Sequence, residues 1–250
     1  MNLNIIINGM TSLLNILYRF SASVGLPNYG VAIILLTILI KTMIYPLTYK
    51  QMVSMRKMIE LQPKIKAIQE KHKDDKEKAN AAVMELYKEH KANPMGGCLP
   101  IAVQMPILWS LYRTLRNFHY GSSAAAAHWF LGFDLTKIYG LSPSLHLILP
   151  IFAGATTYLQ AKVTNPNAST DPTQKAMLYG MPVFFAYISA TVPSGLALYW
   201  VTTNCVSILQ QLYISRRLKK QNKIAQECAM EKTLDKPSER GICNEYLTNK

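Results

Sequence analysis

A run of 40 residues, 176–215, contains no Asp, Glu, Lys or Arg. A soluble domain breaks such a run, because its helices and strands turn a charged face to water. Over the whole chain only 16% of residues are charged, against about 25% in a typical soluble domain. Half of the residues are apolar and only 12 are glycine, which excludes a disordered or collagen-like chain. An ordinary soluble enzyme is therefore disfavoured, and a membrane-embedded protein is favoured.

Five apolar segments have the length of membrane-spanning helices, or nearly so. Pro193 and Gly195 divide the uncharged run, since proline removes a backbone donor and glycine tolerates unusual dihedral angles. We expect every span to be helical, because lipid offers no hydrogen-bond partner to an open backbone. The predicted spans are 30–49, 98–118, 142–161, 176–191 and 194–213, in a core of 29–50 and 98–213.

The distribution of Lys and Arg predicts the orientation of these spans. Eleven of the 27 lie in 50–97 and nine in the tail, 214–250. Because Lys and Arg accumulate on the cytoplasmic side, both segments are expected there, which places the N-terminus outside. The same rule explains the net charge of +13 without nucleic acid. The four cysteines lack metal-ligand spacing and are expected to be free thiols.

Residues 1–28 form an amphipathic segment. Ile6, Met10, Leu13, Leu14 and Leu17 share one helical face, opposite a polar face that includes Asn8, Ser12 and Arg19. This pattern favours a helix that lies in the membrane interface. A short sixth span is the alternative.

Residues 51–97 are highly charged but periodic. Apolar residues recur every three or four positions on both sides of KHKDDKEK, at 71–78. This pattern predicts a cytoplasmic helical hairpin in which Asp74 or Asp75 caps the second helix, and Asn93, Pro94, Gly96 and Gly97 end it. A solvated spacer is the alternative.

Lys41 is a cation inside the first predicted span. Such a residue faces a bundle interior or a water-filled cavity, unless its side chain snorkels to the interface. Three features favour a cavity: Thr37 lies one turn earlier, Gln104 lies within the second span, and the last span has a polar face. That face consists of Tyr199, Trp200, Thr202, Thr203 and Asn204.

Motifs for common chemistries are missing from the sequence. There is no phosphate-binding loop, zinc-protease motif, nucleophile elbow or pair of carboxylates, and the five histidines are scattered. We therefore expect no catalytic residue, metal site or cofactor. The absence of inverted repeats and of carboxylates from the predicted spans disfavours a transporter.

Several segments resemble the YidC/Oxa/Alb membrane protein insertases. They are ILIKTMIYPLTYKQ (38–51), the segment 55–107 with NPMGGCLP and QMPI, and PSGLALYWVTTN (193–204). The resemblance covers about 28–217. It does not include the large periplasmic domain of Gram-negative members or the lipoprotein cysteine of many Gram-positive members.

The resemblance implies an all-α integral membrane protein. Five transmembrane helices would surround a hydrophilic groove, with a cytoplasmic helical hairpin and an N-terminal amphipathic helix. Lys41 occupies the position of an arginine that lines the groove in the family, so the charge is kept but the planar guanidinium fork is lost. Thr37, Gln104 and Trp200 match polar groove positions, and the hairpin matches an element implicated in substrate capture.

The expected function is that of a membrane protein insertase and chaperone in the bacterial cell membrane, not of an enzyme. Its partners would be nascent membrane proteins and the lipid bilayer, with the Sec translocation channel and the ribosome as further candidates and DNA excluded. The basic segment RRLKKQNK (216–223) would contact ribosomal RNA, or would serve only as a cytoplasmic anchor. A small channel or transporter that uses the same groove is the alternative function, and a purely structural assembly factor is a third.

Overall fold

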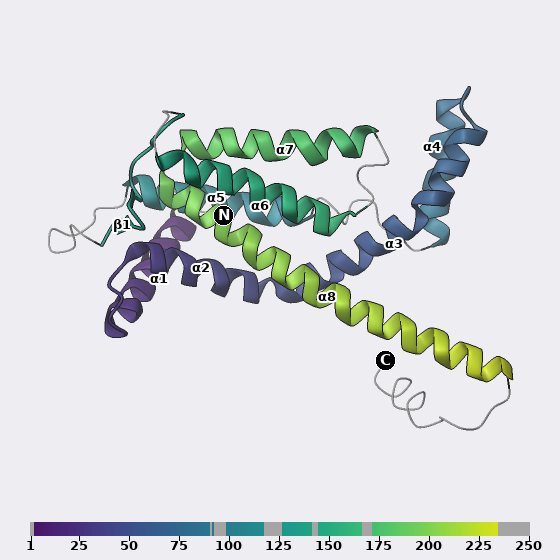
Figure 1. Ribbon diagram of the computed structural model, residues 1–250, viewed down its shortest axis with the longest axis horizontal. Helices are drawn as coiled ribbons and strands as arrows, with labels where there is room; N and C mark the ends of the chain where they lie inside the picture. The colour runs from purple at the N-terminus through teal and green to yellow at the C-terminus, as the bar shows by residue number, and fades with distance from the viewer. Residues whose placement is uncertain are drawn as a thin grey trace. The chain divides into compact units, whose positions relative to one another are not determined.

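The computed structural model describes residues 3–90, 92, 99–117, 127–141, 145–166 and 172–234, and these are predominantly α-helical (Figure 1). The residues expected to end the hairpin, 93–97, lie outside this part. The chain forms two compact units, 1–208 and 209–250. By length and composition, no single described helix is apolar enough over a sufficient length to cross a membrane. One bent pair of helices passes that test when the two are taken together.

Helix α1, Leu3–Ser23, packs against α2, Tyr29–Met43, and α5, Leu99–Asn117. Its apolar face supplies the fully buried Leu14. Polar groups also dock α1: Tyr18 stacks on Tyr29, with ring centroids 4.2 Å apart, and the hydroxyls of Thr11 and Thr114 lie 3.2 Å apart. The apolar face that the sequence indicated therefore packs on protein.

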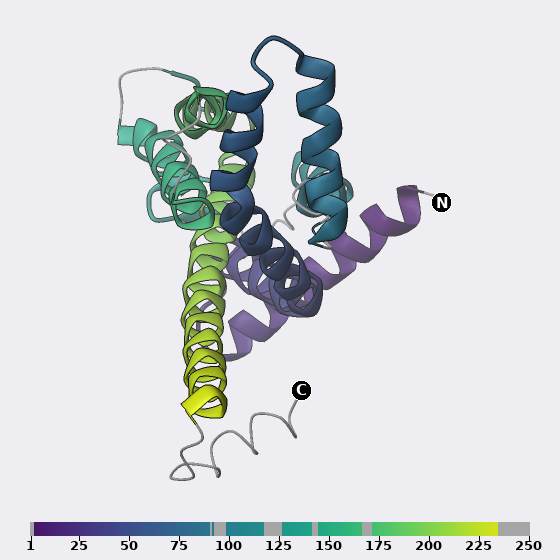
Figure 2. The same cartoon turned by 90° about the vertical axis from the view of Figure 1, so that its right-hand side faces the viewer.

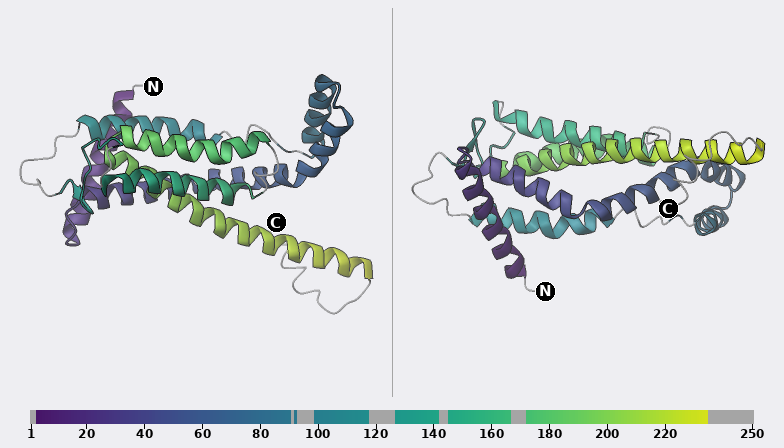
Figure 3. Two further views of the ribbon diagram at one scale, coloured as in Figure 1. Left: turned by 45° about the horizontal axis from the view of Figure 1, so that its top comes forward. Right: turned by 90° about the horizontal axis from the view of Figure 1, so that it is seen from below.

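Helix α2 ends at Met43, and α3, Tyr45–Lys71, continues after a bend of 62° (Figure 3). Pro46, in the first turn of α3, accounts for the break, because proline has no backbone N–H to donate and its ring clashes with the preceding helical turn. The predicted span 30–49 includes both sides of this bend.

Helices α3 and α4, Lys76–Glu89, form an antiparallel pair (Figure 2). The Asp75 side chain caps α4 by accepting a hydrogen bond from the backbone N–H of Lys78 at 3.0 Å, as the sequence predicted. That bond lowers the pKa of the exposed Asp75 carboxyl. Leu61 and Ala79 are buried, so the hairpin has a small core of its own.

A 3₁₀ turn, η3 (Leu145–Leu147), leads into α6, Ile148–Thr164, which packs along α7, Pro172–Thr191 (Figure 3). Gly154 permits the close approach, because a Cβ there would lie 3.0 Å from the Cβ of Ala186. After the predicted turn, α8 runs from Ser194 to Leu234, well beyond the predicted end at 213.

A short hairpin and the segment after it contact two of these helices, α2 and α8. Its strands, β1 (Trp129–Phe130) and β2 (Phe133–Asp134), were not expected from the sequence. The segment after β2 caps α8, since the N–H groups of Ser194 and Gly195 donate to the carbonyls of Lys137 and Leu135, both at 3.0 Å.

The other side of this hairpin is fixed to α2. The Phe130 ring lies directly on Gly30, where a Cβ would collide with it. The Asn28 side chain caps α2 and also donates to the carbonyl of Trp129 at 2.7 Å.

Asp134 lies at the start of the segment that caps α8, and it is buried, with 4% of the residue exposed. Burial raises its pKa, but hydrogen bonds from the backbone and hydroxyl of Thr136 and the nearby His128 and Lys137 outweigh this effect. The pKa of Asp134 therefore lies below its usual value, and the ionised form stabilises the fold.

The substitution Asp134→Asn is expected to lower the free energy of unfolding by about 1–2 kcal/mol at neutral pH, because it weakens these charge-assisted bonds. The difference should shrink as the pH falls through the lowered pKa, where the wild-type carboxylate becomes protonated. Thermal unfolding of both proteins in detergent across acidic and neutral pH measures this. A constant difference at every pH would contradict the assignment.

Candidate functional site

Thr37 and Lys41 lie on one face of α2, one turn apart. Thr37 is fully buried, and its hydroxyl donates to the carbonyl of Ile33 at 2.7 Å. Lys41 is partly buried in the last turn of α2, where the negative end of the helix dipole favours a cation. The α2–α3 bend at Ile44 follows directly, so this cation lies beside the break.

Gln104 and Tyr199 link α5 to α8. Tyr199 is 1% exposed, and the side-chain amide of Gln104 donates a hydrogen bond to its phenol oxygen. Both residues lie in apolar helices, so each provides the partner that the other needs away from water.

Trp200 faces a different neighbour. Its indole N–H donates to the Thr157 hydroxyl on α6 at 3.2 Å. Its ring packs on Phe185 of α7, with centroids 4.0 Å apart. Trp200 therefore connects α8 to both helices of the α6–α7 pair.

Asn204, one turn after Trp200, joins the same contact with α6. Its amide nitrogen donates to the hydroxyls of Thr156 and Thr157, at 3.1 and 2.9 Å. With the amide turned over, the nitrogen donates to Gln160 Oε1 at 2.6 Å and the oxygen accepts from both hydroxyls. Either orientation holds Asn204, which is 4% exposed, against α6.

Four of the predicted groove residues thus lie in two hydrogen-bonded seams. The first seam is Gln104–Tyr199, between α5 and α8. The second consists of Trp200 and Asn204 of α8 with Thr156, Thr157 and Gln160 of α6. Thr203 is partly buried on α8 and its hydroxyl oxygen is fully buried. Thr37 and Lys41 belong to α2, outside both seams.

The three α6 residues were not identified from the sequence. The signal was present, because Thr156, Thr157 and Gln160 are polar residues that follow the apolar stretch 147–155 within an uncharged predicted span. Their pairing with α8 depends on the packing of the two helices, which periodicity does not reveal.

Other candidate sites in the described residues are small. A minor cavity lies near β2 and the α7–α8 turn, lined by residues that include Phe133, Tyr139, His146 and Ser189, and none of the predicted groove residues line it. Within the described ranges, no three His, Cys, Asp or Glu side chains are grouped so that they could hold a metal ion.

The substitution Thr157→Val is expected to release the indole of Trp200, because valine keeps the shape of threonine but lacks the acceptor. The free energy of unfolding should fall by about 0.5–1.5 kcal/mol, and the Trp200 emission should shift to shorter wavelength. Fluorescence in a background with Trp109→Phe and Trp129→Phe measures this. Thr157→Ser is the matched control and should keep the wild-type spectrum. Identical spectra for Val and Ser would contradict the bond.

Comparisons with known proteins place these features in context. Residues 20–222 match the model of a family described as the 60Kd inner membrane protein. The chain is 43% identical over 213 residues to the membrane protein insertase YidC of Wolinella succinogenes, and 43% identical over 216 residues to that of Helicobacter pylori. These alignments cover 85% and 86% of the chain. The chain spans only 37% of the length of either relative.

A solved structure is also similar. It is described as an active YidC insertase crystal structure with the first transmembrane domain resolved, with a TM-score of 0.65 and 27% sequence identity. The similarity covers 84% of this chain and 46% of that one.

Proposed function

Because the chain belongs to the 60Kd inner membrane protein family, we propose that it is a membrane protein insertase and chaperone. In this proposal it accepts hydrophobic segments of newly made membrane proteins through a hydrophilic groove and releases them laterally into lipid. The observation that carries the proposal is the set of polar side chains contributed by α2, α5, α6 and α8, together with the partly buried Lys41 on α2.

We propose five spans, at 30–49, 98–118, 142–161, 176–191 and 194–213, with the N-terminus outside and the C-terminus in the cytoplasm. The charge distribution supports this topology: of the 27 Lys and Arg residues, 11 lie in 50–97 and nine in 214–250, the two segments that it places in the cytoplasm. The α3–α4 hairpin is then cytoplasmic, and the β1–β2 hairpin lies at the outer end of the bundle.

The proposed mechanism lowers a desolvation barrier. A polar tail costs several kcal/mol when it crosses the hydrocarbon core, because its hydrogen bonds to water are lost. The seams offer hydroxyl and amide partners along the crossing, and Thr37 and Lys41 add a cation to the path. A positive charge attracts acidic residues more strongly here than in bulk water, because the surroundings are less polar. The activity breaks no covalent bond, so it assigns no role to a catalytic residue, metal or cofactor.

The substitution Lys41→Glu tests the electrostatic step. Insertion of a small single-span protein with an acidic outer tail should fall about tenfold or more, because attraction becomes repulsion. The measurement is protease protection of that substrate, synthesised beside proteoliposomes that contain the purified protein.

Lys41→Arg is the matched control, since it keeps the charge and should retain insertion. Full insertion by Lys41→Glu would contradict the electrostatic role. If the wild-type protein protects no more substrate than empty liposomes do, and the same vesicles conduct ions, the channel alternative would replace the insertase.

We also propose that the basic part of α8 contributes to ribosome binding. Lys219, Lys220 and Lys223 are exposed there, and contacts of this kind with RNA phosphates release counterions and weaken with salt. Replacement of all three by Gln should reduce co-sedimentation with ribosomes and flatten its salt dependence. Unchanged co-sedimentation, also in a chain truncated after Arg217, would leave these residues only an anchoring role. The Sec channel is a further proposed partner.

A further inference from the structure

Four exposed apolar side chains lie at the end of the bundle that carries β1 and β2. They come from two distant parts of the sequence: the end of α1 with the link to α2, and the β1–β2 hairpin. We call them the apolar rim; they are Val24, Leu26, Trp129 and Leu131, exposed by 64%, 57%, 46% and 81%.

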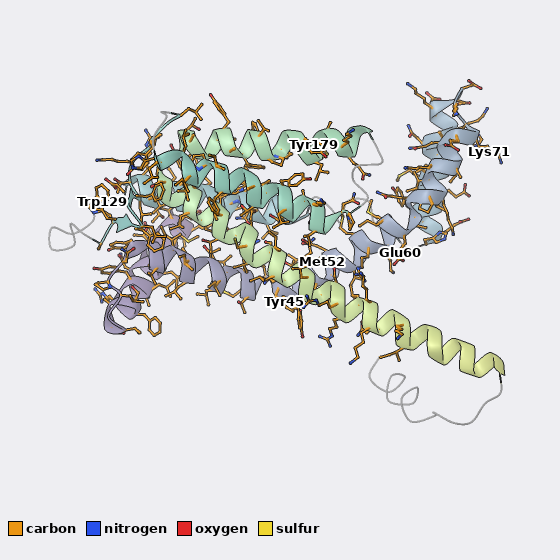
Figure 4. All side chains as sticks on the ribbon, viewed as in Figure 1. Tyr45, Met52, Glu60, Lys71, Trp129 and Tyr179 are labelled. Carbon is orange, nitrogen blue, oxygen red and sulfur yellow. The ribbon has the colours of Figure 1, made fainter. Side chains whose placement is uncertain are left out.

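The two parts of the rim are fixed to each other. Asn28 donates to the carbonyl of Trp129 at 2.7 Å, and the N–H of Tyr29 donates to the carbonyl of Ala127 at 2.8 Å. Phe130 packs on Gly30 in the first turn of α2. The rim is therefore held at a fixed height, level with the first turn of α2. Figure 4 shows Trp129 at this end of the bundle.

Leu131 is the least expected member of the rim. It occupies the left-handed region with φ of +50°, followed by Gly132 at +85°. Two-residue hairpin turns with positive φ at both positions favour Asn-Gly, because asparagine tolerates this conformation and leucine does not. Leucine here carries backbone strain while its side chain points away from the fold. The local structure gives no reason for leucine, whereas an apolar contact outside the chain does.

The neighbouring residues indicate what provides that contact. The Lys137 ammonium group lies 5.9 Å from the centre of the Trp129 ring and is largely exposed. Tryptophan and lysine are typical of the lipid headgroup region, where an apolar body meets lipid and a polar end meets water. The rim is also fixed to the start of α2, where the first proposed span begins. The end of a span lies where the hydrocarbon core gives way to the headgroup region, so the rim lies at the depth of that region.

We propose that the apolar rim inserts into the boundary between headgroups and acyl chains of the adjacent leaflet, with Leu131 as its tip. In the proposed topology this is the outer leaflet. Insertion holds the β1–β2 hairpin, and with it the cap of α8, at a constant depth. The inference rests on the proposed spans and does not depend on insertase activity.

The experiment uses the full chain with Trp109→Phe and Trp200→Phe, so that Trp129 is the sole reporter. The protein is reconstituted into phosphatidylcholine vesicles with acyl chains brominated near the headgroup or near the bilayer centre. We expect shallow bromine to quench Trp129 more than deep bromine, and aqueous iodide to quench it weakly. Quenching by iodide but not by brominated lipid would overturn the proposal, because the rim would then face water.

Quenching by neither agent would also overturn the proposal and would indicate that protein covers the rim. Leu131→Asn is the matched variant, since asparagine suits the positive φ and removes the apolar tip. It should weaken quenching by shallow bromine and strengthen quenching by iodide, while its thermal stability stays equal to or above that of the parent. Unchanged quenching in Leu131→Asn would exclude Leu131 as the tip.

Discussion

The pairing of polar side chains between apolar helices is the constraint on which the bundle depends. A hydroxyl, amide or indole N–H that is removed from water must find a partner on a neighbouring helix. Tyr199 finds Gln104 on α5, while Trp200 finds Thr157 on α6. Two adjacent residues of α8 therefore face two different helices, and this divergence fixes the rotation of α8 about its own axis.

The same constraint links structure to the proposed function. A hydrogen bond between two helices replaces the bonds that its polar groups would make to water. In the proposed function, these groups would release each other and pair with a passing polar segment, so that none of them stays unpaired. Lys41 adds long-range attraction near the α2–α3 break, in the last turn of α2, where the helix dipole favours a cation. In the proposed function, the polarity of the passing segment would then matter more than its specific shape.

Much of the helical order could be predicted from the sequence, because composition and local turn chemistry act over short distances. The α7–α8 turn follows from Pro193 and Gly195, and the α4 cap follows from Asp75. The remainder depends on tertiary contacts. Periodicity identified the apolar face of α1 but not that it packs on α2 and α5, and Pro46 lay within a segment that was expected to be one span.

The candidate site shows the same division. The polar residues of α8 were recognisable because they form a polar face within a long uncharged run. Their separation into two seams was not recognisable, since it depends on which helix packs on which face of α8. The two-residue strands of the β1–β2 hairpin are too short to give a periodic pattern, although they carry the cap of α8.

The contact between Gly30 and Phe130 has an evolutionary consequence. Position 30, in the first turn of α2, has no room for a side chain while the Phe130 ring lies on it. The sizes of the side chains at positions 30 and 130 therefore depend on each other. A relative with alanine or serine at position 30 needs a residue smaller than phenylalanine at position 130. Across the family, side-chain size at these two positions should covary although they lie 100 positions apart in the sequence. Such covariation would reveal the contact between the hairpin and α2 without a structure.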